Sequence, residues 1–365
     1  MHWTSVLSFR YNQAMSTGTP FTASVLAWYS RHGRNDLPWH RSRNPYRVWV
    51  SEIMLQQTQV ATVIPYYQRF VSAFPDIQAL ARAEQDAVMH QWTGLGYYSR
   101  ARHLHSAAQQ VCARHNGHLP DDLDGLCALP GIGRSTAAAI LAFAYGQRQP
   151  ILDGNVKRVL ARYHRVGGYA GTRATESQLW EWADRHTPTK RLADYTQAIM
   201  DLGATVCKRT PQCVVCPVTA GCAAYRDGVT ADYPAPKPRR NRPQKSIAML
   251  LVRDELGQIL LEKRPDHGIW GGLWSLPECE VDADIAIWCE CRLALTVDVE
   301  SPWPPIRHSF SHYHLDITPV PVRKRGELPM LMEQTDRIWY NPANPDDRGL
   351  AAPVKRFIEA LRIAP

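Results

Sequence analysis

The chain has 365 residues, of which 45% are hydrophobic, and its formal net charge is +8. This length exceeds one ordinary domain and the apolar share is ample for packed cores, so we expect about two or three domains. The positive charge favours an acidic partner, and nucleic acid is the commonest. Because no apolar run reaches the roughly 18 residues that a membrane helix needs, the sequence excludes a membrane span and predicts a cytoplasmic protein.

The first half of the chain is patterned as helices. Residues 1–20 lack the apolar core of a secretion signal and form a poorly defined extension. From 21 to 232, apolar positions recur at helical spacing between glycine and proline turns, which predicts an all-α domain. The expected helices span 21–32, 46–74, 84–92, 99–115, 134–145, 155–163, 176–186 and 193–203.

The composition and the apolar pattern of the sequence change after residue 232. Segment 233–245, YPAPKPRRNRPQK, carries four prolines and five bases, which predicts an extended linker. It is either a plain spacer or a strap that contacts phosphates. In residues 246–365, short β-rich runs and helical stretches together predict a small α+β domain. The runs lie at 246–252, 258–262 and 314–318, and the helical stretches at 284–295 and 354–363.

A tight glycine turn, Leu129-Pro130-Gly131-Ile132-Gly133, precedes an apolar helix. Glycine has no side chain and tolerates positive φ, so main-chain amides here can approach a phosphate closely. The segment then leads to a carboxylate, Asp153. Such a turn is as often a simple connection, so its meaning depends on its context.

Four of the nine cysteines cluster in the loop at 207–222, with five, two and five residues between successive members. They are Cys207, Cys213, Cys216 and Cys222. Four thiolates at this spacing can surround one site, and sulfur suits zinc or a [4Fe-4S] cluster. The grouping predicts a structural metal rather than free thiols, but the spacing does not decide between zinc and iron.

Several longer motifs accompany the glycine turn and the cysteines. They are Leu37-Pro38-Trp39, Val48-Trp49-Val50-Ser51-Glu52-Ile53-Met54-Leu55-Gln56-Gln57-Thr58, Gly94-Leu95-Gly96-Tyr97-Tyr98 and Ile151-Leu152-Asp153-Gly154-Asn155-Val156-Lys157-Arg158. In these motifs the chain resembles the MutY family of adenine DNA glycosylases, within the endonuclease III superfamily. The resemblance runs from about residue 21 to the C-terminus. The first cysteine gap is one residue shorter than is usual in that family.

The resemblance implies the architecture, the reaction and the partner. It implies an all-α helix-hairpin-helix glycosylase domain at 21–232, a [4Fe-4S] cluster on the four cysteines, and a Nudix-like domain at 246–365. The expected substrate is double-stranded DNA with adenine opposite 8-oxoguanine or guanine. The expected protein is a monomer, cytoplasmic, or nucleoid-associated if bacterial.

Two carboxylates carry the expected chemistry. Glu52 shares a helix face with Val48 and Leu55, and apolar neighbours raise a carboxyl pKa, although a solvated surface glutamate is the alternative. The resemblance assigns Glu52 as the general acid that protonates adenine. Asp153 fits a helix cap, and the resemblance adds stabilisation of the oxocarbenium-like sugar. Asn155 would orient that carboxylate, or simply start the helix.

Ser135 discriminates between two reaction types. Related glycosylases that also cut the strand place a lysine here, because an amine can form a Schiff base with the sugar. Serine cannot, so the resemblance implies a monofunctional enzyme. An endonuclease III-like glycosylase with lyase activity is the alternative, and a non-catalytic mismatch-binding protein is the alternative from another class.

Extruding adenine from the duplex leaves a gap that side chains must fill. Gln57 can bond the edge of the opposite base, and Tyr97 or Tyr98 can wedge a base step, although either tyrosine could instead pack in a core. Trp39 lines the adenine pocket by resemblance. Together with the hairpin positions, the expected DNA or base contacts are Trp39, Gln57, Tyr97, Tyr98, Gly131, Gly133 and Ser135.

The C-terminal domain contains GGLWSLPEC, from Gly271 to Cys279, which is similar to the opening of a Nudix box. The carboxylates that would hold magnesium are missing, because Ala286, Ile287 and Trp288 stand in their place. Pyrophosphate hydrolysis is therefore not expected. Phe310, Ser311 and His312 match the loop by which the family senses 8-oxoguanine.

Overall fold

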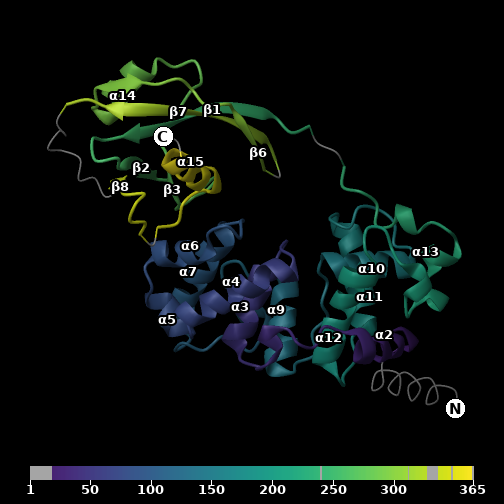
Figure 1. Ribbon diagram of the computed structural model, residues 1–365. Coiled ribbons are helices and arrows are strands. Elements are labelled where there is room, and N and C mark those ends of the chain that lie inside the picture. Colours follow the sequence, from purple (N-terminus) through teal and green to yellow (C-terminus); the bar gives the residue numbers. More distant parts are fainter. Residues whose placement is uncertain (1–18, 239–240, 311, 327–335, 347, 364–365) are drawn as a thin grey trace, which may run out of the picture. The chain divides into compact units, whose positions relative to one another are not determined.

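The computed structural model describes residues 19–238, 241–310, 312–326, 336–346 and 348–363 (Figure 1). The described residues form two compact units. One comprises the residues up to 81 together with 106–238, and the other comprises 82–105 together with the residues from 241 onward. Most of the expected N-terminal extension, and Ser311, lie outside the described residues. Within them, no helix is long and apolar enough to cross a membrane.

The first unit is helical, as the sequence predicts. Its helices are α2 (Pro20–His32), α3 (Pro45–Leu55), α4 (Val60–Ala73), α5 (Ile77–Arg82), α8 (Leu123–Cys127), α9 (Arg134–Ile140), α10 (Gly154–His164), α11 (Arg173–His186), α12 (Leu192–Asp201) and α13 (Ala223–Arg226). Short helical turns lie at Pro38–His40, Cys213–Val215, Thr219–Gly221 and Thr230–Asp232, and π-helical turns extend α9 through Leu141–Tyr145 and α12 through Leu202–Val206. Helix α7 (Ser99–Arg114) passes from the second unit into the first.

One core of this unit is built where α2, α10, α11 and α12 meet, and Figure 1 shows these helices grouped together. Phe21 and Val25 of α2 pack with Val159 of α10, Leu179 of α11 and Ile199 of α12, all nearly inaccessible to solvent. Burying apolar side chains of this size supplies the main free energy that holds such helices together. This core fixes the start of α10, which carries Asp153.

The single helix expected over 46–74 is wrong. The structure has α3 and α4, separated by a turn in which Gln57 adopts a left-handed backbone conformation with φ 58°. Apolar periodicity continues across the break, so the pattern alone does not reveal it. The turn leaves Gln57 exposed at the end of α3.

The second unit contains a mixed sheet, which confirms the predicted α+β domain. Its strands are β1 (Gln244–Arg253), β2 (Ile259–Lys263), β3 (Trp274–Ser275), β4 (Glu278–Cys279), β5 (Val297–Val299), β6 (Ile306–Ser309), β7 (His314–Lys324) and β8 (Arg337–Tyr340). Their principal order is β3-β2-β1-β7-β5, and β4, β6 and β8 pair with β1, β7 and β2. The central β1 and β7 are parallel, from Gln244 opposite His314 to Arg253 opposite Arg323. Strand β1 thus begins inside the expected linker.

Two C-terminal helices accompany the sheet, α14 (Ile285–Leu293) and α15 (Ala352–Ile363), on opposite sides of its strands (Figure 1). Cys289 and Leu293 of α14 pack against Leu250 and Val252 of β1. The same unit includes residues 82–105, with α6 (Gln85–Trp92) and the first turns of α7. The Gly94–Tyr98 motif therefore belongs to the unit that carries Phe310.

Candidate active site

A cavity of about 180 Å³ opens in the helical unit beside α3. Glu52 lines it, with Trp39 and His40 from the turn before α3, Phe143 from the π-helical turn after α9, and Gln197 from α12. Helix α3 is well defined at its start, because Asn44 accepts the Arg47 N–H at 3.1 Å and Pro45 occupies the first position. This rigid helix presents Glu52 to the cavity.

The pKa of Glu52 is raised from its ordinary value of 4.5 to about 8. Burial is the main cause, because it removes hydration from the carboxylate, and the nearby charge of Asp153 adds to it. Apolar Val48 and polar Ser51 lie beside Glu52 in the cavity wall. A carboxyl group with this pKa holds its proton at neutral pH and can donate it.

Asp153 begins helix α10, and its carboxylate is held from two directions. One oxygen accepts the Val156 N–H at 2.7 Å, and the other accepts the side-chain amide of Asn155 at 3.0 Å. Burial raises the pKa of Asp153, while these hydrogen bonds oppose the rise by favouring the charged form. Burial and the charge of Asp153 both raise the pKa of Glu52, whereas burial and hydrogen bonding act in opposite directions on the pKa of Asp153. Asp153 does not line the cavity itself.

Ser135 and the glycine hairpin lie directly upstream of Asp153. The Ser135 hydroxyl accepts the Leu152 N–H at 3.3 Å, so it fixes the backbone next to Asp153. Gly131 has φ 79°, which favours glycine, whereas Gly133 starts α9 with φ −90° and has open space where a Cβ would lie. The amide of Gln56 contacts the hairpin through the hydroxyl of Thr136, at 3.3 Å.

A buried polar network that the sequence did not reveal lies behind the cavity. Asp201, which is inaccessible to solvent, pairs with Arg34 at 2.6 Å and accepts the side-chain amide of Gln197 at 2.7 Å. The carbonyl oxygen of that amide lies 3.0 Å from Nε2 of His40. Arg34 lies 167 positions from Asp201 and His40 lies 157 positions from Gln197, and no spacing or motif connects the members of either pair. The network orients both His40 and Gln197 at the cavity wall.

The structure separates the two tyrosines. Tyr97 has φ 49° and a side chain that is 53% exposed, whereas Tyr98 is buried and its hydroxyl accepts the Gly94 N–H at 3.2 Å. Tyr98 therefore stabilises the turn, and Tyr97 is the exposed member of the pair. Trp39 is also buried, although it borders the cavity, and its ring packs edge-on against Tyr67 with centroids 5.3 Å apart.

Phe310 lies within an aromatic cluster of the second unit. Its ring centroid is 5.3 Å from that of Trp270, 4.6 Å from that of His308 and 5.1 Å from that of Tyr313. Phe310 is half-buried, and His312 is exposed beside it. These ring contacts support the loop at Phe310.

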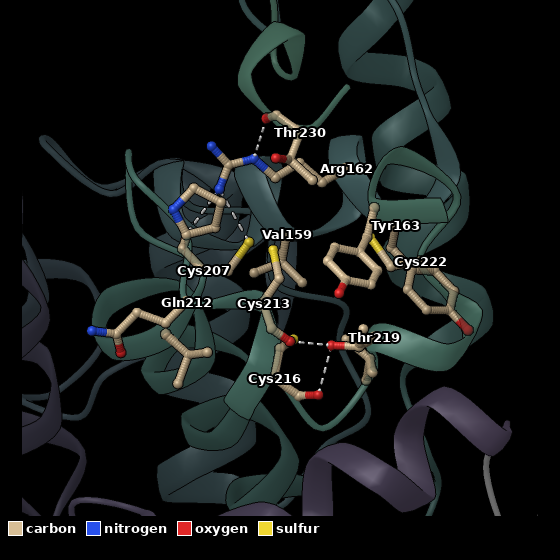
Figure 2. Close-up of a pocket in the computed structure, with 14 residues that line it drawn as sticks. Val159, Arg162, Tyr163, Cys207, Gln212, Cys213, Cys216, Thr219, Cys222 and Thr230 are labelled. Carbon is tan, nitrogen blue, oxygen red and sulfur yellow. Dashed lines mark hydrogen bonds between the residues drawn. The ribbon is translucent and has the colours of Figure 1, made fainter. Parts of the chain in front are cut away.

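The four clustered cysteines line a second, smaller cavity, of about 20 Å³, in the helical unit (Figure 2). Burial raises the pKa of Cys213, Cys216 and Cys222. Among the described residues, no three His, Cys, Asp or Glu side chains are arranged as ligands of one metal ion. The soft donor set from a single loop nevertheless fits a metal or an iron–sulfur centre, because all four thiols reach the same space.

Two arginines of α10 hold the cysteine loop. Arg162, which is 4% exposed, donates to the carbonyls of Thr230 and Lys208, at 2.9 and 2.6 Å, and to the sulfur of Cys207 at 3.3 Å. Arg158 donates to the Cys207 carbonyl at 2.7 Å and to the side-chain oxygen of Asn155 at 2.9 Å. A continuous chain of hydrogen bonds therefore joins the cysteine loop to Asn155 and, through it, to Asp153.

Comparisons with known proteins match both units. Residues 50–185 match the HhH-GPD superfamily of base excision DNA repair proteins, and residues 248–360 match a NUDIX domain. These matches confirm the predicted helix-hairpin-helix and Nudix-like folds. The solved structure of a thermostable thymine-DNA glycosylase aligns with a TM-score of 0.51 at 26% identity, over 57% of this chain and 95% of that one.

Similarity to curated relatives extends over nearly the whole chain. The adenine DNA glycosylase of Buchnera aphidicola subsp. Acyrthosiphon pisum is 36% identical over 343 residues, covering 94% of this chain and 97% of that protein. The adenine DNA glycosylase of Homo sapiens is 34% identical, covering 92% of this chain and 72% of that protein. From this shared length and from the two matched domains, it follows that the chain belongs to the adenine DNA glycosylase family, whose members are DNA glycosylases of base excision repair.

Proposed function

We propose that the protein removes adenine from duplex DNA in which adenine lies opposite 8-oxoguanine or guanine, without cutting the strand. One observation carries the proposal: Glu52 faces a cavity with its pKa raised to about 8, close to a second carboxyl group, Asp153, whose charge contributes to that rise. We assign the proton donor to Glu52 and the carboxylate to Asp153, the pair of roles that glycosidic bond cleavage requires.

In this mechanism the adenine enters the cavity after leaving the base stack. Glu52 protonates a ring nitrogen of adenine, and the C1′–N9 bond breaks with its electron pair moving to the base. The carboxylate of Asp153 stabilises the positive charge that develops on the sugar. Water then adds to C1′, and its proton returns to Glu52, so that an abasic site and free adenine result.

Ser135 supports hydrolysis over strand cleavage. A lyase needs an amine that attacks C1′, and the Ser135 side chain offers only a hydroxyl. That hydroxyl is also engaged by the Leu152 N–H, at 3.3 Å. We therefore favour the monofunctional reaction over an endonuclease III-like one.

The remaining candidate residues divide between the base pair and its backbone. Exposed Gln57 and Tyr97 suit the space that the adenine vacates, and the Phe310–His312 loop suits recognition of 8-oxoguanine. Gly131 and Gly133 suit contact with a phosphate at the start of α9. We assign Tyr98 to packing of its turn. Ser311 lies outside the described residues, and its expected role in contacting 8-oxoguanine stays a prediction.

Cys207, Cys213, Cys216 and Cys222 would hold a [4Fe-4S] cluster, which would tie the loop 207–222 together when bound. Arg162 and Arg158 would then lie against this centre from α10, and Arg158 would link its loop to Asn155. The role that follows for the cluster is structural. Visible absorbance of the purified protein, with iron and zinc analysis, separates an iron–sulfur cluster from zinc.

The function is tested with duplexes that carry one adenine opposite 8-oxoguanine, guanine or thymine. Strand breaks should appear only after alkali treatment, and for the 8-oxoguanine and guanine duplexes but not for the thymine duplex. No alkali-labile site in any duplex would refute the proposal. Breaks without alkali, together with covalent trapping by borohydride, would support a lyase instead.

A further inference from the structure

The second unit contains a contact between the α6–α7 segment and the sheet domain that the proposed function does not use. Arg102, in the first turns of α7, donates a hydrogen bond to the main-chain carbonyl of Gly271. Gly271 directly follows Trp270, whose ring packs against Phe310. The contact therefore connects α7 with the aromatic cluster that supports the Phe310 loop.

The interface around this bond is closely fitted. A Cβ on Gly272, which has φ 71°, would lie 3.0 Å from the carboxylate of Asp266, 3.0 Å from the amide of Gln85 and 3.4 Å from Cδ of Arg102. A Cβ on Gly349 would lie 2.9 Å from Met89 of α6. Both glycines thus let the helices approach more closely than any other residue would allow.

Charged groups add to the fit. Asp86 of α6 pairs with Lys263 at 2.9 Å and accepts the indole N–H of Trp274 at 3.2 Å. The amide of Gln85 donates to the Asp266 carboxylate at 3.0 Å. The contacts of Asp86 are partly buried and the Gln85–Asp266 bond is exposed, and together these directional contacts favour one register of the two surfaces.

The start of α7, which carries Arg102, adjoins the turn that contains Tyr97 (the Tyr97 turn). Tyr97 and Tyr98 directly precede α7, and the Tyr98 carbonyl accepts the Arg102 N–H at 3.2 Å. Arg100, in the same turn of α7, donates to the Gly96 carbonyl at 3.0 Å, and its guanidinium lies 5.4 Å from the centre of the Tyr97 ring. A shift of the first turn of α7 would therefore move Tyr97 as well.

On the sheet side, Trp270 connects the carbonyl that Arg102 binds with the Phe310 loop. It is a bulky residue with φ 51° and is only 7% exposed, so its backbone is held in an unfavourable conformation by its surroundings. Its ring contacts both His308 and Phe310, with centroids 5.3 Å away in each case. The carbonyl that Arg102 binds belongs to the next residue.

We propose that Arg102 is a positioning residue that couples the Phe310 loop to the Tyr97 turn. Through this coupling, the Phe310 loop contacts 8-oxoguanine at the same time as Tyr97 enters the space that the flipped adenine vacates. This inference rests on the proposed roles of Phe310 and Tyr97. It assigns Arg102 to selectivity for the base opposite adenine, and not to the bond-breaking step.

The test is the ratio of single-turnover excision rates for adenine opposite 8-oxoguanine and opposite guanine, measured on the full-length protein. Arg102→Met removes the donor to Gly271 and keeps the apolar stem. We expect it to slow excision opposite 8-oxoguanine on the order of tenfold more than excision opposite guanine, within the usual range of coupling between two sites. Arg102→Lys, which retains a donor, should recover part of the ratio.

Arg114→Met is the matched control, because Arg114 is exposed at the far end of the same helix, and it should keep the wild-type ratio. If Arg102→Met fails to fold, Arg102→Gln provides the measurement, since its side chain is too short to reach Gly271. A wild-type ratio in the Met or Gln variant, or equal slowing on both duplexes, overturns the inference. A wild-type protein that excises adenine from neither duplex contradicts the proposed function instead.

Discussion

Raising the pH should switch off base excision by removing the proton from Glu52. The perturbation is a pH series from 6 to 9 on the wild-type protein, with DNA bound at saturation so that only the chemical step is observed. The general acid must be protonated to act, so the rate follows the protonated fraction of Glu52. Asp153 acts as a carboxylate in the proposed mechanism, and its hydrogen bonds from Val156 and Asn155 favour that form.

The magnitude follows from the pKa of Glu52, which is raised from 4.5 to about 8. At about 1.4 kcal/mol per pH unit, the protein disfavours the ionised form by roughly 5 kcal/mol, as an upper value. With a pKa of about 8, about nine-tenths of the molecules are protonated at pH 7 and about one-tenth at pH 9. The rate should therefore be nearly constant from pH 6 to 7 and fall about tenfold between pH 7 and 9.

The assay is single-turnover release of adenine from an 8-oxoguanine duplex, quenched with alkali. A glutamate with its ordinary pKa of 4.5 would instead lose about tenfold in rate for each unit from pH 6 upward. That slope, without a plateau between pH 6 and 7, would falsify the assignment of a raised pKa to the acid. Asp153→Asn gives a second check, because removing its charge should move the descending limb to lower pH in any residual activity.

Three further predictions concern the surrounding framework. Ser135→Lys should gain a borohydride-trapped covalent adduct with DNA that the wild type lacks, because it places an amine near the sugar; the absence of any adduct would show that this position does not face C1′. Arg162→Met should lower the free energy of unfolding in urea by about 3 kcal/mol, because it removes a buried guanidinium that binds several partly buried carbonyls, and a loss below about 0.5 kcal/mol would argue against that role. His164 and His186, whose ring nitrogens lie 2.8 Å apart, have pKa values lowered to about 3 and about 4, mainly by burial. Below pH 6.5 the unfolded chain binds protons on these two histidines and the folded chain does not, so the free energy of unfolding of the wild type should be complete above that pH and fall toward pH 4. His164→Gln should weaken this fall. An identical pH dependence in the variant would contradict the prediction.

The sequence predicted the fold well where periodicity is strong. Most of the longer helices, the strands at the centre of the sheet and the two C-terminal helices lie where the apolar patterns place them, whereas the short helices α5, α8 and α13 were not predicted. The break between α3 and α4 was missed, because glutamine is not a residue typical of the left-handed conformation and Gln57 therefore leaves no sequence signature comparable to glycine or proline. Boundaries of this kind depend on tertiary packing that a local pattern does not contain.

The candidate site was predictable as a set of motifs and not as a network. Glu52, Asp153 and the cysteines were singled out by residue type and resemblance, and their assigned roles remain proposals. Tyr98 is buried and Tyr97 is exposed because one face of their turn meets the core. Two adjacent tyrosines have the same side chain, so the sequence does not predict which of them is buried. The contacts of His40 with Gln197 and of Arg102 with Gly271 join residues that are 157 and 169 positions apart, so only folding brings them together.

The central claim is that Glu52 delivers the proton that releases adenine. Its most direct test is the amount of free adenine liberated from an 8-oxoguanine duplex in one turnover by the wild type and by Glu52→Gln, which keeps the shape of the side chain but has no acidic proton. The account predicts adenine from the wild type and a rate about a hundredfold to ten-thousandfold lower from the variant, the range expected for loss of a general acid. Release of adenine by Glu52→Gln at the wild-type rate would contradict it.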